Sequence, residues 1–273
     1  MSLDPAKVAA ILAEVADAEI LPRFRALEAH DVREKSPGQL VTAADVAAEA
    51  ALSRRLLALL PGAGVLGEEA AADDPALFDL LDGETPVWVI DPVDGTINFA
   101  NGRPGFAVIV ALVSGGVTRA GWILDPLEGV CVSAERGAGA WHDGRRLRLA
   151  GDVPVGAMTG AAYGRIGSEA RTADLLTASG RIGAVVNRMS SGIDYLSLAL
   201  GRSHFQLSSR SLPWDHAAGV LIADEVGAAT GFIDGTPYDP RVPDRGVLTV
   251  ASATGWETIR DVILGSRAAE PRS

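Results

Sequence analysis

The amino-acid sequence predicts a mixed α/β protein in which helices and sheets are layered. Apolar residues at helical spacing alternate along the chain with short β-rich runs. One of these runs, residues 87–90, is wholly apolar, as expected of a buried strand. The chain has 273 residues, of which 48% are hydrophobic and 22% charged. This composition supports a substantial core. We expect a single unit over residues 1–273 with two subdomains, at about residues 1–150 and 151–273.

The N-terminal half is expected to begin with two helices. Apolar residues at helical spacing from Val8 onward predict a helix over about residues 5–27. A polar loop follows at residues 31–39, and a second helix is expected over about residues 42–60 because Pro61 and Gly62 would stop it. β-rich runs predict strands at residues 65–66, 87–90, 106–113, 117–124 and 131–133, with a hairpin turn at residues 114–116.

The C-terminal half alternates helices and strands again. The expected helices lie at residues 167–178, 193–200 and 216–226, and the expected strands at residues 182–186 and 247–251.

Charge and composition exclude several classes of protein. The net charge of −11 works against binding to nucleic acid or to anionic membranes. No apolar run approaches the roughly 20 residues that cross a bilayer, and the N-terminus lacks the basic lead of a signal peptide. Cys131 is the single cysteine, which excludes an intramolecular disulfide and a cysteine-rich zinc site. We expect a cytoplasmic protein that binds neither nucleic acid nor membranes. Metal cations would still let an acidic site accept phosphorylated substrates.

The most informative segment follows the apolar strand at residues 87–90. Asp91 and Asp94, with the carbonyl of Val93 between them, offer three oxygen ligands from one loop, as hard cations such as Mg2+ prefer. Gly95 and Thr96 then begin a short helix whose unpaired N–H groups favour a phosphate. The alternative is a surface turn in which Asp94 caps the next helix. The first interpretation is favoured because α/β proteins bind ligands at the carboxyl ends of strands.

Two more acidic residues lie next to the ends of predicted elements, as Asp91 and Asp94 do. Glu68 follows a predicted strand directly after Gly67, although a solvated acidic pair with Glu69 would give the same pattern. Asp215 opens a predicted helix, where a carboxylate that interacts only with the helix dipole is also common.

Taken together, these strings resemble the signatures of the inositol monophosphatase family. The matching strings are Gly67-Glu68-Glu69, Asp91-Pro92-Val93-Asp94-Gly95-Thr96 and Trp214-Asp215-His216-Ala217-Ala218-Gly219, and the stretch from Lys35 to Asp45 resembles the N-terminal segment of that family. They occur in family order and span most of the chain. The resemblance implies a layered α/β/α/β/α fold of the inositol monophosphatase and fructose-1,6-bisphosphatase type. It also implies a lithium-sensitive homodimer that hydrolyses phosphate monoesters with two or three Mg2+ ions.

The same resemblance assigns roles to individual residues. Glu68 and Thr96 would orient the attacking water, with Asp45 and Thr42 in support, although Thr42 and Asp45 also have the spacing of a helix capping box. Lys35 is interpreted as a solvated loop charge. The metal ligands would be Glu68, Asp91, the carbonyl of Val93, Asp94 and Asp215, and the substrate contacts Asp94, Gly95, Thr96, Ser191, Gln206 and Asp215.

The chain departs from the family pattern on the substrate side. Inositol-specific members carry an acidic residue shortly before the Trp-Asp motif, whereas residues 204–213 contain no carboxylate. Gln206 can hydrogen-bond hydroxyl groups, and Arg210 is either a contact for a second anionic group or surface charge. The substrate is therefore open among a phosphorylated polyol such as inositol 1-phosphate, histidinol phosphate, fructose 1,6-bisphosphate and adenosine 3′,5′-bisphosphate.

The chemistry expected of such a site is direct attack by a metal-activated water, without a phosphoenzyme. The sequence contains no P-loop, nucleophile elbow or His-Glu-x-x-His motif that would provide another route. His216 is interpreted as structural, the other three histidines lie in expected loops or strand ends, and no zinc site is expected. A non-catalytic metal-binding protein is the alternative from another class, and it is disfavoured because every expected ligand is present.

Overall fold

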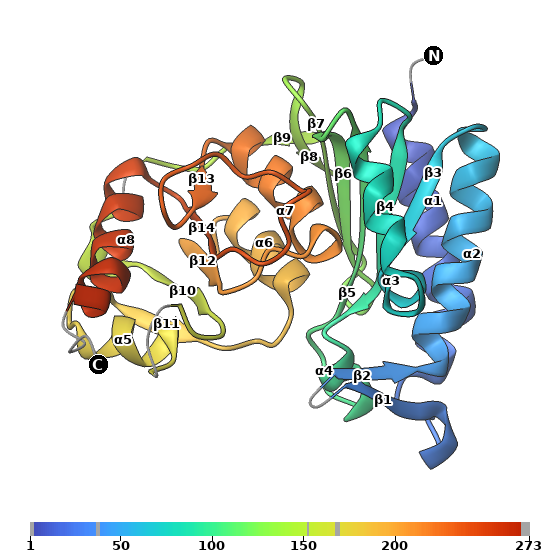
Figure 1. Ribbon diagram of the computed structural model, residues 1–273, viewed down its shortest axis with the longest axis horizontal. Helices are drawn as coiled ribbons and strands as arrows, with labels where there is room; N and C mark the ends of the chain where they lie inside the picture. The colour runs from blue at the N-terminus through green and yellow to red at the C-terminus, as the bar shows by residue number, and fades with distance from the viewer. Residues whose placement is uncertain (1–2, 37–38, 152, 167–169, 269–273) are drawn as a thin grey trace.

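The protein is built of five layers in the computed structural model, which describes residues 3–36, 39–151, 153–166 and 170–268 (Figure 1). Helices α1 (Pro5–Val15) and α2 (Ala43–Leu59) cover the outer face of a seven-stranded sheet, and α6 (Ser191–Ala199) and α7 (Pro213–Val226) lie between this sheet and a five-stranded one. Helices α5 (Thr172–Ala178) and α8 (Ala253–Ala268) cover the far face of the second sheet. The predicted α/β/α/β/α layering is confirmed.

The seven-stranded sheet is a continuous meander apart from its first strand. β3 pairs in parallel with β4, and every later neighbour is antiparallel. The order is β3 (Gly64–Gly67), β4 (Val87–Asp94), β5 (Ala107–Ser114), β6 (Val117–Asp125), β7 (Val130–Glu135), β8 (Gly139–His142) and β9 (Arg145–Leu147).

The five-stranded sheet has mixed pairing, with β10 parallel to both of its neighbours. Its order is β11 (Ala184–Val186), β10 (Thr159–Ala162), β12 (Phe205–Ser208), β14 (Val247–Val250) and β13 (Ala229–Phe232). The remaining elements are the hairpin β1 (Val32–Ser36) and β2 (Gln39–Thr42), the short helices α3 (Glu68–Asp73) and α4 (Thr96–Ala100), and 3-10 helices at Ala29–Asp31, Pro75–Asp82 and Val155–Ala157.

Strand β4 is buried on both faces, as its apolar sequence predicts. Trp88 and Ile90 face α1 and α2, whereas Val87 and Val89 belong to the core shared with α6 and α7. That second core combines residues from both sides of residue 150, so the division into subdomains at about 1–150 and 151–273 stays a prediction. Within the described ranges, no helix combines the length and the apolar character needed to cross a bilayer.

Four expected elements differ from the structure. The first helix ends at Val15 and continues as a π-turn (Ala16–Ile20) and a 3-10 turn (Leu21–Arg23), where Pro22 cannot donate a helical hydrogen bond. The polar loop at 31–39 contains the hairpin β1–β2, whose mostly polar strands lack apolar alternation. β4 does not end at residue 90 but continues to Asp94. The helix expected from residue 167 begins at Thr172, and residues 167–169 lie outside the described part.

Small residues let α7 approach its neighbours closely. A Cβ atom on Gly121 of β6 would lie 2.8 Å from the Cα atom of Ala218, and one on Gly219 would lie 2.0 Å from the ring of Tyr195 in α6. The position of α7 between the two sheets therefore depends on glycine at both points.

We expect Gly219→Ala to destabilise the protein by about 1–3 kcal/mol, because the added methyl group overlaps the buried Tyr195 ring. This loss outweighs the gain of about 1 kcal/mol in helix propensity. The measurement is urea unfolding followed by circular dichroism.

Gly265→Ala in α8 is the matched control, because a Cβ atom there meets nothing within 4 Å. This variant should be stabilised by about 0.5–1 kcal/mol. Equal effects of the two substitutions would contradict the packing argument.

Candidate active site

Three carboxylates, two of them buried and the third partly buried, meet where β4 ends and α7 begins. Asp91, Asp94 and Asp215 each offer an oxygen atom that lies within 4.8 Å of the others. Asp91 is 1% exposed and Asp94 is 7% exposed. The two strand residues and the helix residue are separated by more than a hundred positions in the sequence, so the fold itself assembles this acidic cluster.

An irregularity in β4 turns both aspartates to the same place. Asp91 pairs with Ile109, but the next pair is Asp94 with Ala107, so three steps on β4 match two on β5. The amide of Val93 donates to Asp91 Oδ1 at 3.1 Å. Gly95 has a φ of 90°. A side chain at Gly95 would also meet the carbonyl oxygen of Gly105 at 2.8 Å, so position 95 requires glycine.

Burial and mutual repulsion make the cluster unfavourable for negative charge. Burial raises the pKa of Asp91 well above its usual value, and the charges of Glu68, Asp94 and Asp215 add to this effect. The pKa of Asp215 is raised for the same reasons. Burial also raises the pKa of Asp94, although hydrogen bonds to its carboxylate oppose the shift. A divalent cation would offset this repulsion, and an all-oxygen set is the donor chemistry that Mg2+ prefers.

The segment before and at the start of α6 holds Asp94. The carboxylate of Asp94 accepts hydrogen bonds from the Ser191 amide at 3.1 Å, the Ser191 hydroxyl at 2.9 Å and the Gly192 amide at 2.8 Å, and also from the Ser190 hydroxyl. Ser191, expected as a substrate contact, therefore lies at the site and orients Asp94. The string Ser190-Ser191-Gly192 resembles the family loop that lines the substrate pocket, but no signal in the sequence pairs it with Asp94.

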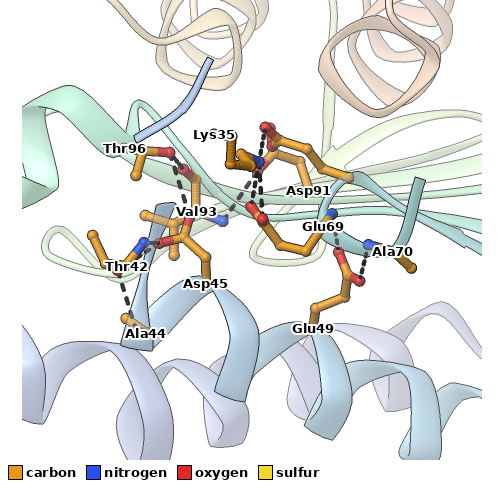
Figure 2. A network of polar contacts seen from close by, with 11 residues as sticks. Lys35, Thr42, Ala44, Asp45, Glu49, Glu69, Ala70, Asp91, Val93 and Thr96 are labelled. Atoms are coloured by element: carbon orange, nitrogen blue, oxygen red, sulfur yellow. Dashed lines mark hydrogen bonds and ion pairs between the residues drawn. The ribbon is translucent and has the colours of Figure 1, made fainter. Parts of the chain in front are cut away.

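Asp45 connects the start of α2 with the loop after β4 (Figure 2). Its carboxylate accepts the Thr42 amide at 2.8 Å and the Thr42 hydroxyl at 2.5 Å, so the capping box is present. The other oxygen accepts the Thr96 hydroxyl at 3.3 Å, and that hydroxyl also contacts the Val93 carbonyl at 3.0 Å. Burial raises the pKa of Asp45 to about 6. The capping box is therefore present, and the supporting role of Thr42 and Asp45 in hydrolysis stays a prediction.

Glu68 and Glu69 lie at the start of α3 and share Lys35. The Lys35 ammonium is 3.1 Å from Glu68 Oε1 and 2.8 Å from Glu69 Oε1. Burial lowers the pKa of Lys35, but the two carboxylates outweigh it and raise this pKa above its usual value. Burial raises the pKa of Glu69 to about 7. The interpretation of Lys35 as a solvated charge is wrong, because its side chain is 17% exposed and doubly paired.

A cavity of about 390 Å³ opens beside Glu68. Lys35, Phe78, Arg210 and Trp214 contribute to its walls. The Arg210 side chain is 52% exposed and lies 3.6 Å from Asp244 in an ion pair. The charge of Arg210 opposes the rise in the pKa of Asp215, so Arg210 is close enough to act electrostatically on the acidic cluster.

Gln206, expected as a substrate contact, and His216, expected to be structural, are both buried. Gln206 lies in the middle of β12 with 1% of its surface exposed, and it is paired between β10 and β14. It is therefore less accessible to a substrate than its place before the Trp-Asp motif suggests. His216 is also buried, 3.0 Å from the Tyr195 hydroxyl, and burial lowers its pKa to about 3. This environment agrees with a structural role for His216.

Comparisons with known proteins identify relatives of this chain. Residues 4–267 match the inositol monophosphatase family. The chain is 35% identical over 232 residues to an inositol-1-monophosphatase SuhB of Mycobacterium tuberculosis strain H37Rv. The matched region covers 82% of this chain and 78% of the relative. It is 30% identical to a protein of Xylella fastidiosa named Nus factor SuhB, over 83% of this chain and 81% of that one.

Solved structures show the same fold. An inositol monophosphatase of Thermotoga maritima superposes with a TM-score of 0.80 at 22% identity, over 95% of this chain and 98% of that chain. A SuhB protein of Bartonella henselae superposes with a TM-score of 0.78 at 24% identity, over 94% and 98% of the two chains. With the match over residues 4–267, the layered fold and the acidic cluster, these findings show that the chain belongs to the inositol monophosphatase family of phosphoric monoester hydrolases.

Proposed function

We propose that this protein is a Mg2+-dependent phosphatase that hydrolyses a small phosphorylated polyol or a related metabolite. The observation that carries the proposal is the cluster of Asp91, Asp94 and Asp215: two buried carboxylates and a partly buried one, whose oxygen atoms converge within 4.8 Å. Buried carboxylates in such a group are costly unless a cation accompanies them. Their oxygen-only chemistry favours Mg2+ over zinc or copper.

The acidic residues of the site are the proposed metal ligands. Asp91, Asp94 and Asp215, with Glu68 and the carbonyl of Val93, would hold two or three Mg2+ ions. Bound Mg2+ supplies an activated water and relief of negative charge on the phosphoryl group.

The Thr96 hydroxyl has only one proton, and its neighbours Asp45 and Val93 both offer acceptor oxygens. Thr96 therefore donates its hydrogen bond to one of these oxygens, and the lone pairs of its own oxygen remain available to orient the attacking water. Glu68 is the second residue proposed to orient that water. Gly95 and Thr96 are proposed as phosphate contacts, and Ser191 as a residue at the substrate side.

The substrate class is inferred from the names of the relatives and from the positions at which this chain departs from the family pattern. The Mycobacterium tuberculosis relative is named an inositol-1-monophosphatase, which favours inositol 1-phosphate. A related Staphylococcus aureus protein has been crystallised with inositol monophosphate and with 2′AMP, so nucleotides fit one such scaffold. Histidinol phosphate, fructose 1,6-bisphosphate and adenosine 3′,5′-bisphosphate are the alternatives, because residues 204–213 lack the carboxylate expected for inositol specificity.

Other properties are proposed on family grounds and on charge. We propose inhibition by lithium, a homodimer and a location in the cytoplasm. The net charge of −11 supports a protein that binds neither nucleic acid nor anionic membranes.

The direct test is release of inorganic phosphate from a panel that contains these esters and glycerol phosphate. We expect release with Mg2+, none with EDTA, and inhibition by Li+, because the ester bond needs the cation-assisted water. The preferred ester then identifies the substrate class. Metal-independent release would contradict the proposal.

Asp91→Asn should lower phosphate release by more than about 100-fold, because a neutral amide is a poor ligand for Mg2+ at the centre of the cluster. Circular dichroism should show an unchanged fold. Asp143→Asn is the matched control, since the Asp143 side chain is 85% exposed and outside the cluster. Full activity of Asp91→Asn would show that the assignment of Asp91 as a metal ligand is wrong, and equal loss in both variants would point to a general defect.

The metal-free protein should lose thermal stability as the pH rises from about 5.5 to 7.5. Glu69 and Asp45 have folded-state pKa values of about 7 and about 6, above their usual values, so the folded state binds more protons than the unfolded state in this range. His216, whose pKa is lowered in the folded state, makes stability rise with pH below its usual pKa. This effect comes from one group, whereas several buried carboxylates act in the other direction.

Mg2+ should raise the melting temperature more at pH 7.5 than at pH 5.5, because protons and cations compete for the same carboxylates. Scanning fluorimetry at both pH values, with EDTA or with Mg2+, measures this difference. KCl at equal ionic strength is the control for screening. A melting temperature in EDTA that rises steadily from pH 5.5 to 7.5 would contradict the expected sign.

A further inference from the structure

Helix α2 presents two buried carboxylates to the active site, one turn apart. Asp45 and Glu49 are separated by four residues, so they lie on the same face of the helix. Asp45 is 0% exposed and Glu49 is 7% exposed. Asp45 reaches the loop after β4 through Thr96, whereas Glu49 reaches the end of β3. No role in hydrolysis has yet been given to Glu49.

Glu49 binds the backbone that directly follows Glu68. One of its carboxylate oxygens accepts the amide of Glu69 at 2.8 Å and the other accepts the amide of Ala70 at 2.9 Å (Figure 2). These amides belong to the first turn of α3, where N–H groups have no acceptor within the helix. The N-cap residue Gly67 has no side chain that could accept them. A charged acceptor from another helix therefore fixes the first turn of α3.

The residue before Glu68 is fitted to the same carboxylate. Gly67 has a φ of −96°, which any amino acid adopts, so its backbone conformation does not require glycine. A Cβ atom there would instead lie 2.3 Å from the carboxyl carbon of Glu49. Glu49 fills the space that a side chain would need. The backbone is therefore held on both sides of Glu68.

We propose that Glu49 is a positioning residue, which holds the backbone around Glu68 so that the Glu68 carboxylate is directed toward the Asp91 and Asp215 carboxylates and completes the cation site. The inference deepens the proposed function and rests on it, because it takes Glu68 as a metal ligand.

Lys35 cannot position Glu68 in the way proposed for Glu49. Its ammonium binds the Glu68 carboxylate itself, and so competes with a cation for the same oxygen atoms. Glu49 acts only through the backbone, so its contacts are compatible with a bound cation. The direction of Glu68 is therefore preserved when its carboxylate leaves Lys35.

The test is the isosteric variant Glu49→Gln. A glutamine oxygen can accept one of the two amides, while its NH2 group faces the other amide as a second donor. We expect the dissociation constant for Mn2+, measured by electron paramagnetic resonance on the full-length protein, to rise about 10-fold to 100-fold. Half-maximal phosphate release should require correspondingly more Mg2+, with kcat at saturating Mg2+ close to that of the unaltered protein.

Glu225→Gln is the matched control. Glu225 in α7 also accepts two backbone amides, those of Gly137 at 2.5 Å and Gly139 at 2.8 Å. It lies ten residues along the helix from Asp215, which is about 15 Å at the usual rise. This variant should bind Mn2+ as the unaltered protein does. Melting temperatures in EDTA report the loss of folding stability in each variant, so a stability effect can be separated from an effect on binding.

Glu49→Asp provides a second variant, since it keeps the charge but withdraws the oxygen atoms from the two amides. It should also weaken Mn2+ binding. Unchanged Mn2+ binding in both Glu49 variants would overturn the inference, as would an equal loss in Glu225→Gln. If the unaltered protein itself bound no Mn2+ and released no phosphate, the proposed function would fail instead.

Discussion

Concentrated negative charge at a largely buried junction is the constraint on which the site depends. Asp91 and Asp94 are buried, Asp215 beside them is partly buried, and Glu68 adds its charge to them. The surrounding structure supplies N–H, hydroxyl and ammonium donors to the acidic residues at the edges of this group: Ser191 and Gly192 bind Asp94, and Lys35 binds Glu68. Donors hold the geometry, but the central carboxylates stay unfavourable as anions. The fold thus builds a place whose repulsion a bound cation would offset.

The layered architecture explains how such a place forms. β3 and β4 are parallel neighbours, so the residues that follow both strands emerge at the same edge of the sheet. Helix α2 covers that edge from one side with Asp45 and Glu49. Helices α6 and α7 approach from the other side, with Asp215 at the start of α7, and glycines permit their close contact. Rigid elements on both sides therefore position the acidic residues, as precise sites generally require.

The sequence allows most of the fold class and the centre of the site to be predicted, because those signals are local. Asp91 and Asp94 lie in one short string, and the long apolar patterns predict α2, β4, β5 and β6. The partners of these residues are not local: Ser191 meets Asp94 across 97 positions, and Glu49 meets the Glu69 amide across 20. For Gln206, nearness in sequence is misleading. It lies shortly before the Trp-Asp motif, but its side chain is buried within β12. The hairpin β1–β2 was missed because its strands lack apolar alternation.

The long separation between Asp94 and its partners also bears on the order of folding. The seven-stranded sheet is a chain of local pairings, which close quickly, whereas the junction needs loops of about a hundred residues to close. Asp91 and Asp94 can thus be placed by β4 and β5 while they are still hydrated. Asp215 joins these two aspartates only when α7 docks, so the electrostatic cost of the cluster accompanies closure of the long loop. A cation that binds the cluster would stabilise the docked arrangement by mass action.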